Sequence, residues 1–156
     1  MLQHRLGLDW LATTFALLIA LAGCTPLIAP YSAKAYENAT SLKAQTLALM
    51  DKSDEPYSKH SGEIEGPNGH TAKLNAAYEY VAGLDNNSIS ARQWRILIDK
   101  DGKLYGKFIS RWQDDGVLRE AFITEFKEQV SNAFDEIICL EINKKASKKC
   151  SEVTGE

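Results

Sequence analysis

The sequence predicts an all-α protein, a compact bundle of four or five antiparallel helices. Apolar residues recur at spacings of three and four in several separate segments, which is the period of an amphipathic helix. Groups of glycine, proline, asparagine and aspartate separate these segments, as turns do in a helical bundle. The length beyond residue 23 suits one domain, which we expect to span residues 32–142.

The first helix is expected to begin at Ser32 and to end at about residue 52. The serine oxygen can accept from a free amide of the first turn, which favours a helix start there. The inward face of this helix repeats at spacings of four and three and consists of Ala35, Ala39, Leu42, Thr46 and Leu49. This helix and the last one are expected to be the longest.

The next segment, residues 53–70, is less regular. A short helix is expected from Glu55 to about Glu65, because proline at position 56 suits a first helical turn. Residues 66–69, Gly-Pro-Asn-Gly, end it. A further helix then runs to about Gly83, and its apolar face consists of Leu74, Ala77, Tyr78, Val81 and Leu84.

Residues 94–110 allow two interpretations. Residues 90–93, Ser-Ala-Arg-Gln, match a capping box and predict that a helix begins at the serine. Apolar and aromatic residues then step by four from Leu104 to Trp112, which favours two short helices joined at residues 99–102. A β-hairpin around Asp101-Gly102 is the alternative. We favour the helices, since an isolated two-stranded hairpin needs a surface to pack on.

The last helix is expected to run from about Leu118 to about Ile142. Four lysines follow between residues 144 and 149, and cations are favoured at a helix C-terminus. Residues 143–156 are therefore expected to form a basic, solvated tail. The apolar face of the helix consists of Phe122, Ile123, Phe126, Val130, Phe134, Ile137 and Ile138.

The first 24 residues carry the most specific motif of the chain. A weakly positive start precedes an uncharged apolar run at residues 10–22, which is shorter than the ~20 residues of a membrane span. Small residues follow and lead directly to a cysteine, in the order Leu21-Ala22-Gly23-Cys24. This layout is that of a secretory signal. The four residues resemble the lipobox of bacterial lipoproteins, and the resemblance covers residues 1–24.

The resemblance implies that residues 1–23 are a cleaved signal peptide and that Cys24 carries a diacylglyceryl thioether and an N-acyl group. This covalent lipid is the only cofactor we expect. Two or more acyl chains give stable anchoring, because each buried methylene contributes ~0.8 kcal/mol. Thr25, where the family often has aspartate for inner-membrane retention, favours the periplasmic face of the outer membrane; the inner membrane and the cell surface are the alternatives. Residues 24–31 would be the acylated cysteine and a short tether stiffened by prolines.

Two cysteines remain after Cys24, at Cys139 and Cys150. Export would place them in an oxidising compartment, where disulfides persist. We expect a Cys139–Cys150 disulfide, which closes a small loop; two separate thiols are the alternative. No histidine lies near either cysteine in sequence, which argues against a zinc site there.

No pattern in the sequence predicts a catalytic or metal site. Residues 99–103 resemble a calcium loop only faintly, because Lys103 occupies the third ligand place and Leu104 the sixth position, where the loop needs glycine. His60, Glu63, Glu65 and His70 could approach a zinc ion, but a solvated polar loop is the better interpretation. There is no nucleophile elbow, phosphate loop or dinucleotide motif. The net charge of −3 excludes a large basic surface for nucleic acid.

The aromatic residues Tyr80, Trp94, Tyr105 and Trp112 are the candidate interaction residues, because Trp and Tyr are enriched in binding hot spots. Filling the core of a small helical domain is the alternative role, and we favour it.

The domain after the signal peptide resembles the small helical lipoproteins of Gram-negative envelopes whose roles are not assigned. We therefore expect a non-catalytic lipoprotein that contacts a protein partner at the cell envelope. An immunity or exclusion lipoprotein that blocks a toxin or phage is a narrower version. A carrier of a lipid or other apolar ligand, and with less support a cell-wall hydrolase, are the alternatives.

Overall fold

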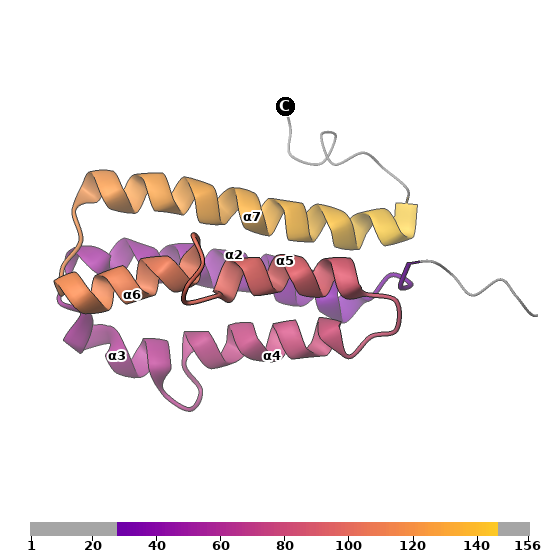
Figure 1. The fold of residues 1–156 in the computed structure, drawn as a ribbon, viewed down its shortest axis with the longest axis horizontal. Coiled ribbons are helices and arrows are strands. Elements are labelled where there is room, and N and C mark those ends of the chain that lie inside the picture. The colour runs from indigo at the N-terminus through magenta and orange to yellow at the C-terminus, as the bar shows by residue number, and fades with distance from the viewer. Residues whose placement is uncertain (1–27, 147–156) are drawn as a thin grey trace, which may run out of the picture.

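A computed structural model describes residues 28–146, and helices are the only regular secondary structure in this part of the chain (Figure 1). The all-α prediction is confirmed. In chain order the elements are α2 (Ala33–Asp51), the 3-10 turn η1 (Lys52–Asp54), α3 (Tyr57–Glu65), α4 (His70–Ala82), α5 (Ser88–Ile98), α6 (Tyr105–Asp115) and α7 (Glu120–Ala146).

The helices form an antiparallel, up-and-down bundle (Figure 1). Helix α2 runs one way, α3 and α4 return along its side, α5 and α6 follow the direction of α2, and α7 returns again. Helix α2 contacts α4 and α7, and α5 contacts the same two helices, so these four helices enclose one core. Short connections between sequential antiparallel neighbours are the simplest way to build such a bundle.

The core is built from the helical faces that the sequence pattern indicated. The inward residues of α2 are buried as expected, and Ser32 caps the helix by accepting from the amide of Ala35 at 3.2 Å. The ring of Trp94 on α5 meets that of Phe134 on α7 edge to face, with centroids 5.9 Å apart. Burying such rings contributes more than their area alone, because edge-to-face pairs add ~0.5–1.5 kcal/mol.

Residues 94–110 are helical, and the favoured interpretation is confirmed. Helix α5 ends at Ile98 and α6 begins at Tyr105. Gly106 explains how the start of α6 packs so closely against the end of α5. A Cβ atom at Gly106 would lie 2.2 Å from the carbonyl oxygen of Asp99, so only glycine fits this contact.

Two predictions near helix ends are wrong. Helix α5 begins at Ser88, so Ser90 lies inside the helix and is no capping residue. Its hydroxyl donates instead to the carboxylate of Glu141, 51 residues away. Helix α7 continues to Ala146, so residues 143–146 belong to the helix and not to a solvated tail. In both places a tertiary contact outweighs the local pattern.

The domain also begins earlier than expected. Ala29 is 3% exposed, and its amide donates to the carbonyl of Asn86 at 3.1 Å. Ala29, predicted as part of the tether, thus already contacts the turn between α4 and α5. The chain therefore enters the bundle at the end where α4 ends and α5 begins (Figure 1).

Candidate functional site

The predicted aromatic interaction face does not exist as one surface. Trp94 and Trp112 are fully buried and Tyr105 is 2% exposed, so the interpretation of these three as exposed binding residues is wrong. They lie on inward faces and fill the core, which was the favoured alternative. Tyr80 alone is exposed, at 38%, and its hydroxyl lies 3.0 Å from the hydroxyl oxygen of Ser32.

The two histidines of the domain lie in different environments. His60 contacts the carboxylates of Glu55 and Glu63 at 3.3 and 3.7 Å on the surface of α3. His70 begins α4 in the core, where its Nε2 atom lies 2.7 Å from the hydroxyl of Thr46. Within residues 28–146 no three side chains of metal-binding type converge.

Burial lowers the pKa of His70 to about 4, with a further contribution from the nearby ammonium of Lys73. The folded state therefore binds a proton on His70 less readily than the unfolded chain does. We expect this contribution to stability to be complete above pH 6.5 and to be lost as the pH falls from 6.5 towards 4, at up to ~1.4 kcal/mol per pH unit. Urea unfolding of the wild-type protein and of His70→Gln between pH 7 and 5 measures it. The prediction is contradicted if the free energy of unfolding changes equally with pH in the two proteins.

A buried polar cluster joins the end of α7 to the start of α5. The Lys144 ammonium donates to Glu141 Oε1 at 2.7 Å, to Ser90 Oγ at 2.8 Å and to Asn87 Oδ1 at 2.5 Å. The side chains of Lys144 and Glu141 are 3% and 0% exposed. Asn87 also donates to the carbonyl of Val81, which ties the cluster to the end of α4.

A serine beside a lysine can act as a nucleophile and its general base in some enzymes. The cluster offers no such chemistry in this geometry. The Ser90 hydroxyl donates to Glu141 Oε1, and the Lys144 ammonium donates to the same oxygen, so the hydroxyl hydrogen points to the carboxylate and not to the lysine. Ser90 is fully buried, so a substrate cannot reach it. The cluster therefore stabilises the packing of α7 against α5.

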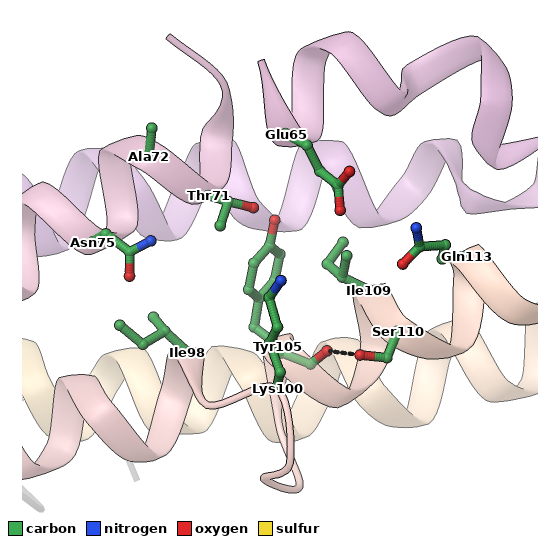
Figure 2. Close-up of a pocket in the computed structure, with 11 residues that line it drawn as sticks. Glu65, Thr71, Ala72, Asn75, Ile98, Lys100, Tyr105, Ile109, Ser110 and Gln113 are labelled. Atoms are coloured by element: carbon green, nitrogen blue, oxygen red, sulfur yellow. Dashed lines mark hydrogen bonds between the residues drawn. The ribbon is translucent and has the colours of Figure 1, made fainter. Parts of the chain in front are cut away.

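A cavity lies where α3 meets α4 and α5 meets α6 (Figure 2). Its volume is about 380 Å³, in the range of small-molecule sites. The ring of Tyr105 stands between the two pairs of helices (Figure 2). The polar side chains around it are Glu65, Thr71, Asn75, Lys100, Ser110 and Gln113, and apolar contacts come from Ala72, Ile98 and Ile109.

A second hollow, of about 330 Å³, lies between α6 and α7. Phe122 and Phe126 stack in it with ring centroids 4.3 Å apart, and Val117 beside them is 48% exposed. The cations Lys107, Arg111 and Arg119 also line it. Arg111 is paired with Asp115 at 2.7 Å. We call this surface the α6–α7 groove.

Sequence reasoning missed Lys144 and the cavity at Tyr105. A signal for the first was present, because Val130, Phe134, Ile137, Glu141 and Lys144 continue the inward stripe of α7 at spacings of three and four. The cavity left no such signal, since its walls come from four helices whose relative positions the sequence does not show.

The predicted cysteine sites are placed only in part. Cys139 is buried on α7, whereas Cys24 and Cys150 lie outside the described residues, so the lipidation and the Cys139–Cys150 disulfide stay predictions. Comparison of the chain with protein-family models, curated proteins and solved structures finds no match. Between residues 28 and 146, every helix is too short or too polar to cross a bilayer.

Proposed function

We propose that this chain is a periplasmic lipoprotein, anchored through acylated Cys24, that binds a protein partner through the α6–α7 groove. The observation that carries the proposal is the position of the groove relative to the chain entry. Ala29, where the described chain enters, lies at the α4–α5 end of the bundle, and the helix ends that line the groove lie at the opposite end (Figure 1).

The entry point supports an orientation in which the α4–α5 end of the bundle faces the membrane. Ala29 is seated against Asn86, and only residues 25–28 separate it from Cys24. Five residue steps span at most roughly 18 Å. With Cys24 acylated, the turn between α4 and α5 therefore stands beside the bilayer. Thr25 favours the outer membrane as the location.

The groove then points away from the membrane. Helix α2 has 19 residues, so its ends lie about 28 Å apart. At the far end, the amide of Leu118 donates to the carbonyl of Ser53, which fixes the turn before α7. A partner could reach the groove there without competing with lipid.

The chemistry of the groove favours a helix with an apolar stripe and acidic flanks. Partly exposed aromatic rings at its centre supply the kind of surface that dominates binding energy. Lys107 and Arg119 at its rim attract acidic side chains and orient the partner. A protein with this binding mode needs no catalytic group, and an immunity or exclusion role would be one use of it.

The test is site-specific photocrosslinking in intact cells. We expect a crosslinker at Val117 to capture a discrete partner, and a crosslinker at Glu79, exposed on α4, to capture none. The captured segment should be an acidic, amphipathic helix. Lys107→Glu with Arg119→Glu should reduce capture at least tenfold by charge repulsion.

Capture that is equal at both positions, or unchanged by the charge reversal, would contradict the proposed groove. Circular dichroism of the charge-reversed variant provides the control for folding. Both substituted side chains are exposed, so a change of more than about 0.5 kcal/mol in stability is not expected.

A further inference from the structure

The cavity at Tyr105 carries opposite charges in one small space. Glu65 contributes a carboxylate from the end of α3, and Lys100 contributes an ammonium from the turn after α5 (Figure 2). The remaining polar lining is neutral, so the charges sum to zero. Such a site favours a ligand that also carries one charge of each sign.

Tyr105 supplies a buried hydroxyl beside the cavity. The residue is 2% exposed, and its hydroxyl makes no hydrogen bond of regular geometry within residues 28–146, although the Thr71 side chain lies next to it. Figure 2 shows the hydroxyl between Thr71 and Glu65, at the edge of the cavity. Burial raises the pKa of Tyr105, so the hydroxyl keeps its proton and remains a donor. A buried donor without a regular hydrogen bond lowers stability, which makes it a feature that needs an explanation.

The start of α4 adds a second preference for a negative group on the same side. Gly69 precedes the helix and has no side chain to cap its first amides, and the first turn contains no acidic residue. A helix N-terminus carries a partial positive charge that favours an anion. Thr71 and Ala72, from this first turn, line the cavity.

We propose that this cavity binds a zwitterionic dipeptide with small apolar side chains. The ligand carboxylate accepts from Lys100 and, once the half-buried Thr71 side chain rotates aside, from Tyr105. The ligand ammonium donates to Glu65. This site is separate from the α6–α7 groove and does not depend on the proposed function.

The remaining lining fits the middle of such a ligand. The side-chain amides of Asn75 and Gln113 can donate to and accept from a peptide group, since each amide carries both functions. Ile98 and Ile109 offer apolar contacts to methyl groups. A water molecule occupies ~30 Å³ of liquid, so the cavity holds roughly a dozen non-hydrogen atoms, the size of a dipeptide of two alanines.

Isothermal titration of the full-length protein in detergent tests the proposal. The probes are dipeptides of glycine, alanine and valine, in both enantiomeric forms, and N-acetyl dipeptide amides of the same sequences as uncharged controls. We expect saturable binding of at least one dipeptide and at least tenfold weaker binding of its capped form. Binding of no dipeptide, or equal binding of the capped form, overturns the proposal, and so does preferential binding of glucose.

Three variants assign the contacts. Tyr105→Phe removes one oxygen and should weaken dipeptide binding about tenfold, while thermal stability stays equal or rises because a buried donor without a regular hydrogen bond is lost. Glu65→Gln should weaken binding similarly, and Glu79→Gln, at an exposed position of α4 outside the cavity, should not. If Tyr105→Phe binds as the wild type does, the assigned role of Tyr105 is wrong.

Discussion

Substitution of Lys144 by methionine is expected to destabilise the protein by about 3–5 kcal/mol. The variant keeps the length of the side chain but removes the ammonium that faces Glu141. The Glu141 carboxylate is fully buried and its Oε2 atom already has no hydrogen-bond partner in the described part of the chain. Without Lys144 only the hydroxyl of Ser90 remains to stabilise the charge, and a buried uncompensated charge is costly.

The double variant Lys144→Met with Glu141→Leu separates charge from packing. It removes both charges together, so we expect most of the lost stability to return. Lys59→Met is the matched exposed control, because Lys59 pairs with Glu55 at 3.3 Å in solvent and such pairs contribute ~0–1 kcal/mol. Urea unfolding followed by circular dichroism measures all three. If Lys144→Met lowers the free energy of unfolding no more than Lys59→Met does, the cluster does not stabilise the packing of α7 on α5.

Replacement of Cys24 by alanine is expected to abolish lipid attachment completely. The sulfur of Cys24 is the attachment point that the lipobox resemblance implies, and alanine offers no nucleophile in its place. Wild-type protein grown with radiolabelled palmitate should carry the label, and its intact mass should correspond to residues 24–156 plus acyl groups. The variant should incorporate no palmitate.

Cys150→Ala is the control for this experiment, since it removes a different thiol and should leave labelling unchanged. The proposal of a lipoprotein fails if wild-type protein remains unlabelled with residues 1–23 still attached. Label retained in the Cys24→Ala protein would instead place the acyl chain on another residue. Neither outcome bears on the cavity at Tyr105, which is tested on purified protein.

The helices could be predicted from the sequence because each helix buries one face against the core, and this places apolar residues at spacings of three and four. The stripe from Ala35 to Leu49 and the stripe from Phe122 to Ile138 predict helices that the structure contains. The boundaries were less secure. Ser90 matched a capping pattern, but its hydroxyl is used by Glu141, a residue that only the packing of α5 on α7 brings near.

The sequence by itself determined that the chain is helical, where its turns fall and that Leu21-Ala22-Gly23-Cys24 has the pattern of an acylation site. These are local properties, since a helical period, a turn or a peptidase motif is read within a few neighbouring residues. Only the tertiary structure decided that Trp94, Tyr105 and Trp112 are inside, that Lys144 is buried, and that Glu65 and Lys100 line one cavity. Which side chains are buried, and which ones from different helices meet in one site, depends on how the helices are oriented relative to one another. A short stretch of sequence does not specify that orientation.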